Sequence, residues 1–174
     1  MQDTSYFPVE EKRGRIATAY TEDHGTLQRA GQDHFREGAK YPAPEGGLFS
    51  TATDIARFYQ MMLNGGELEG HRILSPAAVR LMTQVATGEL AAGFAPGVGW
   101  GLGWGVVRNV DGMFRMNSIG TFGHGGAWRT YGWVDPEKDM VGVFLMQRTN
   151  GGGDIADEMN AFMQMAAAAI TTRH

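Results

Sequence analysis

The stretch whose residue types could carry out chemistry runs from Phe122 to Val134. It holds one of the chain's five histidines, His124, between glycines, and then continues into a strand-like run. Glycines beside a polar residue at a strand entrance let the main chain come close to another group, which in an enzyme is often a substrate carbonyl. A main-chain N–H at such an edge can donate a hydrogen bond to a developing oxyanion. The residues alone do not decide whether His124 has a functional or a structural role.

Other kinds of site find less support. No two histidines are paired at helical spacing, so neither a metal site nor a metal cofactor is expected. The glycine-rich runs match neither phosphate-binding motif. A nucleophile is missing as well, because the chain has no cysteine, no Gly-x-Ser-x-Gly and no Ser-x-x-Lys. Gly151–Gly153 could bind an anion before the last expected helix, but a plain loop is the favoured interpretation.

Composition limits the class of protein. The 174 residues are enough for one domain, 1–174, with a hydrophobic core. The net charge is −4, and charges of both signs are interspersed, so no nucleic acid partner is expected. No apolar run is long enough to span a membrane. Localisation is left open, because any signal peptide would precede Met1.

Two helices are expected before the candidate stretch. Ser50 is expected to cap the first one, with Asp54 in its first turn. Its apolar face would consist of Ile55, Phe58, Tyr59, Met62 and Leu63. Ser75 and Pro76 begin the second helix, in which Val79, Leu81 and Met82 would be buried. Residues 1–47 are expected to be irregular, with a short strand at Arg15–Tyr20.

The second half of the chain predicts strands and a final helix. Gly99–Val106 alternates glycine with large apolar residues, which indicates one strand, and another is expected at Met113–Asn117. Thr130–Val134 and Met140–Gln147 should form a hairpin whose second strand is central in the sheet. A helix over Ile155–Thr171, capped by Asp154, would lie on that sheet with Met159, Phe162 and Met163 facing it. This order predicts an α+β fold, an antiparallel sheet with flanking helices.

Several segments resemble, in order, motifs of the serine β-lactamase family, which includes class C β-lactamases, penicillin-binding-protein-like esterases and D-aminopeptidases. Gly47–Phe58 resembles a helix start of that family, and Trp100–Trp104 resembles one of its strands. Phe122–Gly126 resembles its third active-site motif, in which His-x-Gly often replaces Lys-Thr-Gly. The stretches Asn64–Pro76 and Trp133–Gln147 also follow as in the family. The resemblance covers nearly the whole chain.

Two family motifs have no counterpart. Family members carry Ser-x-x-Lys and a Tyr-x-Asn or Tyr-x-Ser motif, and the chain contains neither. Met1–Thr4 resembles the stretch just after the tyrosine motif. The resemblance therefore implies an incomplete β-lactamase/transpeptidase-like fold that lacks its N-terminal part. It also implies an open sheet edge, and hence self-association or pairing with the missing N-terminal segment or a partner chain.

The resemblance also implies roles for individual residues. His124 stands in the place of the third-motif lysine, and the N–H of Ala127 would be one oxyanion donor. A salt-bridged surface role is left open for Arg129. The residues expected to contact substrate are Gly125, Gly126, Trp128 and Arg129.

The activity implied for the complete hydrolase is acyl-enzyme hydrolysis of a small-molecule ester, amide or β-lactam. The residues do not choose among these substrates, although histidine in place of lysine favours an ester. Alone, the chain is expected to be inactive, because the nucleophile and its base are absent. The alternative is a non-catalytic remnant that acts as a binding or assembly module.

Overall fold

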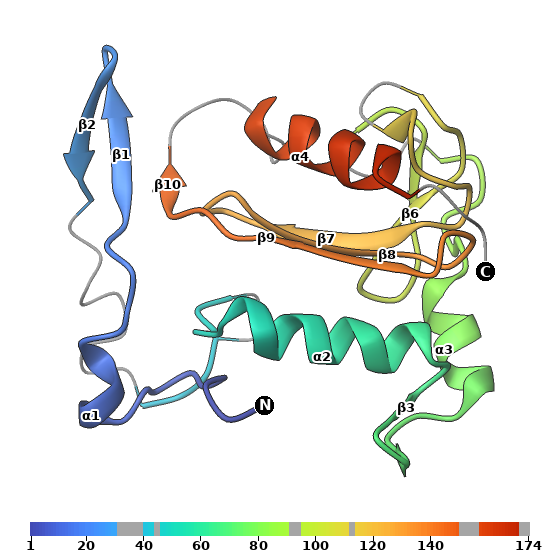
Figure 1. The fold of residues 1–174 in the computed structure, drawn as a ribbon, viewed down its shortest axis with the longest axis horizontal. Helices are drawn as coiled ribbons and strands as arrows, with labels where there is room; N and C mark the ends of the chain where they lie inside the picture. The colour runs from blue at the N-terminus through green and yellow to red at the C-terminus, as the bar shows by residue number, and fades with distance from the viewer. Residues whose placement is uncertain (31–39, 44–45, 91–94, 112–113, 150–156, 171–174) are drawn as a thin grey trace.

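The computed structural model of the chain describes residues 1–30, 40–43, 46–90, 95–111, 114–149 and 157–170 (Figure 1). In chain order its elements are α1 (Glu10–Arg13), β1 (Tyr20–Asp23), β2 (Thr26–Arg29), α2 (Ala52–Leu63), β3 (Glu67–Leu68), β4 (His71–Arg72), α3 (Pro76–Thr83), β5 (Val98–Trp100), β6 (Gly105–Val107), β7 (Phe122–Gly126), β8 (Thr130–Asp135), β9 (Met140–Phe144), β10 (Arg148–Thr149) and α4 (Asp157–Ala168).

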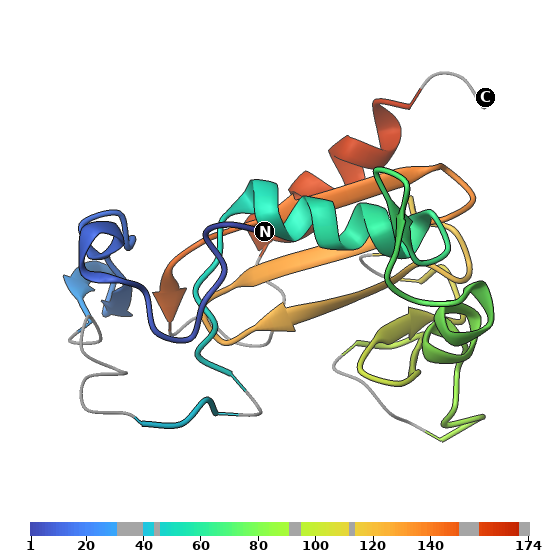
Figure 2. The same cartoon turned by 90° about the horizontal axis from the view of Figure 1, so that it is seen from below.

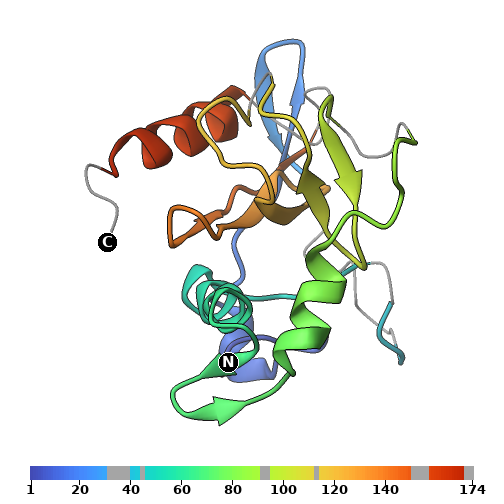
Figure 3. The ribbon, with the colours of Figure 1, turned by 90° about the vertical axis from the view of Figure 1, so that its right-hand side faces the viewer.

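A five-stranded antiparallel sheet forms the centre of the molecule, in the order β5-β6-β7-β8-β9. Helix α2 covers one face of this sheet and α4 covers the other (Figures 1 and 3). The predicted α+β class, an antiparallel sheet with flanking helices, is confirmed.

Alternating strand residues supply two hydrophobic clusters, one on each face of the sheet. On the α2 face, Met62 packs with Phe122 and Val134. On the α4 face, Trp133 packs with Met159, and both are 0% exposed. Burying one such side chain contributes roughly 1.5–3 kcal/mol, so the two clusters hold both helices on the sheet.

Helix α2 begins one residue later than predicted. Thr51 is the N-cap, and its Oγ1 accepts the N–H of Asp54 at 3.2 Å. The cap predicted at Ser50 is wrong, since Ser50 Oγ lies instead 2.8 Å from Thr4 Oγ1. The apolar face is confirmed: Tyr59 and Met62 are buried, and Ile55, Phe58 and Leu63 pack against their cluster.

Helix α3 is capped as predicted, with Ser75 Oγ accepting the N–H of Ala78 at 3.1 Å. Val79 is buried and Met82 packs against the same cluster. Leu81 was expected in the core, but it is 62% exposed. Residues three apart share a helix face and residues two apart do not, so Val79 and Met82 face inward together while Leu81 faces away.

The single strand predicted over Gly99–Val106 is wrong, because the structure folds this run into the hairpin β5–β6. Trp100 pairs with Gly105 across it. The connection contains Gly103 at φ +82, a conformation that favours glycine. Leu102 lies in this connection and is 50% exposed, so it does not continue the strand.

Strand β9 is the last strand of the sheet, so the central position predicted for Met140–Gln147 is wrong, and the strand ends at Phe144. Its apolar character has another cause. Val141 packs against the α2 cluster, and Phe144 packs against the α4 cluster. Both faces are covered, but among the described residues the outer edge of β9 has no strand partner.

A small second sheet stands beside the main one, in the order β10-β1-β2 (Figures 1 and 2). The strand predicted at Arg15–Tyr20 is misplaced, since β1 begins at Tyr20. Its register is set by the turn at His24 and Gly25, both with positive φ, and by parallel pairing of Tyr20 with Arg148. The strand propensities of single residues predict neither this turn nor this pairing.

Two further predictions are only partly covered by the described residues. The strand predicted at Met113–Asn117 is wrong over Phe114–Asn117, where a turn closes with the Asn117 N–H on the Phe114 carbonyl at 2.9 Å. The final helix is confirmed as α4, with Met159 and Met163 buried and Phe162 41% exposed. None of the described helices is long and apolar enough to cross a membrane. Residues 113, 151–156 and 171, which include the cap predicted at Asp154, lie outside the described residues.

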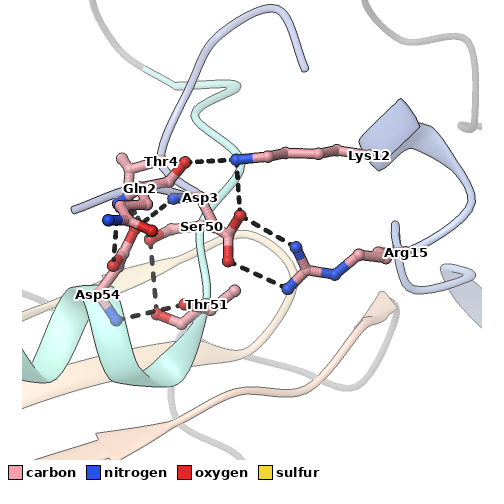
Figure 4. Close-up of polar contacts among 8 residues, drawn as sticks. All are labelled: Gln2, Asp3, Thr4, Lys12, Arg15, Ser50, Thr51 and Asp54. Carbon is pink, nitrogen blue, oxygen red and sulfur yellow. Dashed lines mark hydrogen bonds and ion pairs between the residues drawn. The ribbon is translucent and has the colours of Figure 1, made fainter. Parts of the chain in front are cut away.

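The N-terminal segment is tied to the start of α2 by a buried carboxylate (Figure 4). Asp54, 7% exposed, accepts the N–H groups of Gln2 at 3.3 Å and Asp3 at 2.8 Å. It also accepts the Thr4 hydroxyl at 2.8 Å. Burial alone would raise the pKa of Asp54, but these hydrogen bonds lower it below the ordinary carboxyl value. Beside it, hydrogen bonds from Arg15 and Lys12 lower the pKa of Asp3 to about 2.

We expect Asp54→Asn to destabilise the fold at neutral pH and to lose this effect in acid. A carboxyl group with a lowered folded pKa stabilises the fold above its unfolded pKa, here 3.8, and this stabilisation disappears as the pH falls through the folded value. Thermal unfolding followed by circular dichroism should therefore show the variant and wild type converging in strong acid. Asp23→Asn, an exposed carboxylate in the β1–β2 hairpin, is the control. A gap between variant and wild type that persisted in acid would contradict the prediction.

Candidate functional site

The stretch singled out in the sequence forms the end of β7 and its turn into β8. β7 pairs with β8 along its whole length, from Phe122↔Val134 to Gly126↔Thr130. Its pairing with β6 ends at Gly123. Within the described residues, His124–Gly126 therefore has a strand neighbour on one side only, which leaves the other main-chain edge open.

His124 is exposed on this open edge. Its Nδ1 lies 2.6 Å from the Gly125 carbonyl oxygen. A carbonyl can only accept, so this bond places the proton on Nδ1 and leaves Nε2 as the nitrogen that can accept a proton. The imidazole also lies against the ring of Trp100, with centroids 5.3 Å apart. Trp100 is therefore a neighbour of the candidate histidine.

Helix α2 supports this strand from below. His124 pairs with Gly132, and a Cβ at Gly132 would lie 2.3 Å from the ring of Tyr59. Burial, and to a lesser extent Tyr131, raise the pKa of the Tyr59 hydroxyl well above its usual range, while a hydrogen bond from the main-chain N–H of His124 partly offsets this. Tyr59 was predicted as a core residue, and it is also the residue that holds the main chain at His124.

The turn after β7 is a β-turn over residues 126–129. The N–H of Arg129 donates to the carbonyl of Gly126 at 3.0 Å, which puts Ala127 at the second position of the turn. Ala127 is exposed, and the turn's own hydrogen bond does not use its N–H. Trp128 is half-buried, and its carbonyl accepts the N–H of Arg148 at 3.4 Å.

Arg129 ends the turn with its side chain directed to α4. The residue is 7% exposed, and its Nη1 lies 3.7 Å from Oε2 of Glu158. Glu158 also lies 3.6 Å from Nη1 of Arg148. Of the two roles that the sequence left open for Arg129, this placement favours the salt-bridged one, although the side chain is buried rather than at the surface.

A serine–lysine pair that motif spacing missed lies elsewhere in the structure. Lys138 Nζ donates to Ser118 Oγ at 2.7 Å and to the fully buried Asp135 at 3.3 Å. Burial raises the pKa of Asp135, but hydrogen bonds from Ser118 and the charge of Lys138 lower it overall. Ser118 is only 6% exposed, so its hydroxyl is not open to a substrate. The arrangement therefore supports the β8–β9 turn and does not present a nucleophile.

Metal ligation finds no candidate in the described parts of the chain, where no group of three or more His, Cys, Asp and Glu side chains could hold an ion. In the described residues the site therefore consists of one open strand edge, an exposed imidazole with a defined tautomer and a turn whose own hydrogen bond does not use the N–H of Ala127. These groups can bind and polarise a carbonyl oxygen, but they include no nucleophile.

The Beta-lactamase family model matches residues 1–164. The chain belongs to the beta-lactamase family. Protein Rv1367c from Mycobacterium tuberculosis is 35% identical to the chain over 166 residues. That match covers 84% of this chain and 40% of Rv1367c, so the chain spans well under half the length of this curated relative.

Solved structures show the same β-lactamase/transpeptidase-like fold. EstCE1, described as a hydrolase with promiscuous acyltransferase activity, has a TM-score of 0.76 at 20% identity, and the match covers 95% of this chain and 46% of that one. Simvastatin synthase from Aspergillus terreus has a TM-score of 0.72 at 17% identity, with 97% and 46% covered. An octameric penicillin-binding protein homologue from Pyrococcus abyssi has a TM-score of 0.62 at 21% identity, with 97% and 34% covered. The resemblance to penicillin-binding-protein-like esterases is confirmed. The chain covers less than half of each of these three solved structures.

Proposed function

We propose that residues 1–174 act as one domain, the C-terminal portion of a beta-lactamase-related serine hydrolase, and supply its oxyanion and substrate edge. The observation that carries this proposal is the open strand end His124–Gly126, followed by a turn whose own hydrogen bond does not use the N–H of Ala127. A fixed main-chain donor at a strand edge is the kind of group that stabilises a tetrahedral oxyanion.

Each residue of the edge has a proposed task. The N–H of Ala127 binds the oxyanion, and Nε2 of His124 orients substrate or takes part in proton transfer near the serine. Gly125 and Gly126 allow the substrate to lie close to the main chain, because they place no side chain over it. Trp128 contacts the substrate beside the turn. Contact of substrate with Arg129 stays a prediction, and the ion pair of its buried side chain with Glu158 favours a supporting role.

The proposed reaction needs groups that this chain does not carry. The chain contains neither Ser-x-x-Lys nor Tyr-x-Asn or Tyr-x-Ser, so the nucleophile and its proton carriers come from a segment outside it. The serine oxygen attacks the carbonyl carbon of an ester, amide or β-lactam and loses its proton to the lysine–tyrosine pair. The bond to the leaving group then breaks as that group is protonated, and water releases the acyl group. Histidine in place of the third-motif lysine favours an ester.

The test of this proposal is active-site labelling. A fluorophosphonate probe should leave the 174-residue chain unlabelled, since it holds no activated serine. The same chain combined with the upstream segment that carries Ser-x-x-Lys should give labelling on that segment's serine, as detected by intact mass. Stoichiometric labelling of the chain alone would show that a nucleophile is present here, and failure of the complete protein to react would remove the hydrolase assignment.

One observation favours the second candidate function, a binding or assembly module. Among the described residues, the outer edge of β9 has no strand partner. Three large apolar side chains are also exposed, one just after β9 and two on α4: Leu145 at 43%, Phe162 at 41% and Met165 at 72%. An unpaired apolar edge promotes association with another strand. We propose that this edge binds either a second copy of the chain or the segment missing from it.

A further inference from the structure

Arg129 adopts a backbone conformation that its side chain disfavours. Its φ is +59, in the left-handed region that costs a non-glycine residue about 1–2 kcal/mol. The other described non-glycine residues with positive φ, His24, Glu69 and Asp139, are all exposed, whereas Arg129 is buried. A strained residue persists only where its surroundings hold it in place.

Charged side chains from several elements meet at this residue. Glu158 of α4 lies 3.7 Å from Arg129 with one carboxylate oxygen and 3.6 Å from Arg148 with the other. Arg148 of β10 is also ion-paired with Glu22 of β1. Its main-chain N–H bonds the carbonyl of Trp128. The last two residues of the turn are thus both held by contacts outside it: Arg129 through its side chain and Trp128 through its carbonyl.

The Arg129 guanidinium is buried, whereas its partner Glu158 is 49% exposed. A buried charge is costly unless it is paired, and among the described residues Glu158 is the carboxylate that pairs with it, so the Arg129 side chain follows Glu158. The side chain and main chain of Arg129 are linked through one Cα, and a fixed guanidinium therefore favours the left-handed conformation. That conformation closes the turn whose second residue is Ala127.

We propose that Glu158, acting through Arg129, is a positioning residue that fixes the 126–129 turn and with it the direction of the Ala127 N–H. Its meaning for catalysis rests on the proposed function. The positioning itself concerns only residues of this chain and can be measured without any activity.

The experiment follows amide hydrogen exchange and ¹H–¹⁵N shifts in the 174-residue chain. In Glu158→Gln the amide of Arg129, which closes the turn, should exchange its hydrogen about tenfold faster. This factor corresponds to most of the free-energy cost of the left-handed conformation. The chemical shift of the Ala127 amide should also change. Asp157→Asn removes the neighbouring first-turn carboxylate of α4 and is the matched control for helix charge. It should leave both signals as in wild type.

The Arg129→Gly variant, used as a second background for Glu158→Gln, distinguishes positioning of the turn from a general stabilisation of α4. Arg129→Gly accepts positive φ without strain, so Glu158→Gln should change the residue-129 amide by less than about twofold in that background. If Glu158→Gln has no effect in the wild-type background, or the same effect in both backgrounds, the proposal is overturned. Labelling of the complete protein by fluorophosphonate does not depend on this result, so the two proposals fail separately.

Discussion

Ala127→Pro should lower kcat of the complete hydrolase by about 100- to 1,000-fold, the usual cost of losing one oxyanion donor. Proline has no N–H, so the substitution removes the proposed donor itself. It should do so without disturbing the fold, because Ala127 is the second residue of a β-turn, a position that proline favours, and is exposed. KM should change little, since the donor acts mainly in the transition state.

Steady-state hydrolysis of a small p-nitrophenyl ester measures this effect. Ala127→Gly keeps the N–H and is the matched control, which should retain a rate close to wild type. Thermal unfolding of the 174-residue chain verifies that the proline variant is folded. If a folded Ala127→Pro enzyme turned over like the glycine variant, the N–H of Ala127 would have no role in holding the oxyanion.

Gly142→Ala should lower the free energy of unfolding by about 3 kcal/mol, at the upper end of the usual cost of overpacking. A Cβ at Gly142 would lie 2.1 Å from Cζ2 of Trp133 and 2.3 Å from its Cε2. The Trp133 side chain is 0% exposed and is packed in the same cluster as Met159 and Met163, so it has little room to move. The added methyl group must therefore displace either β9 or the indole ring.

Urea denaturation measures the loss. Gly14→Ala is the control, because Gly14 has φ −63 and no atom within 4 Å of an added Cβ. Trp133→Phe shortens the ring at the point of contact, so the double variant should lose less than the sum of the two single changes. A Gly142→Ala variant as stable as the Gly14→Ala control would show that the contact between β9 and the indole is loose.

The parts of the fold predicted correctly are those governed by neighbours in the chain. The apolar period of α2, the Ser75 cap of α3 and the β8–β9 hairpin all depend on residues within a few positions of one another. Some local details were wrong, among them the Ser50 cap and the buried Leu81, but the error in sheet order concerns long-range partners. Val141 and Phe144 made β9 look central, yet it is apolar because two helices cover it, and no local pattern states which strand lies beside another.

The candidate site divides in the same way. His124–Arg129 is one continuous segment, so its imidazole, its glycines and its place at a strand edge could be predicted from residue types. The turn over 126–129 that ends β7 was not predicted. The groups that support it were missed as such, since Tyr59, Trp100 and Glu158 come from α2, β5 and α4. Spacing along the sequence gives no sign that they meet. The Ser118–Lys138 pair, twenty positions apart, was missed for the same reason.

The sequence by itself determined the chemistry available and its limits: an imidazole among glycines, the order of family motifs, and no nucleophile motif. Those properties are carried by residue type and short spacing, which folding does not alter. Only the tertiary structure decided where the side chains point and what they meet. It left the Ala127 N–H unused by its turn, placed the proton on Nδ1 of His124 and turned Arg129 toward Glu158. Burial and ion pairing depend on which elements pack together, and that is settled when the helices close on the two faces of the sheet.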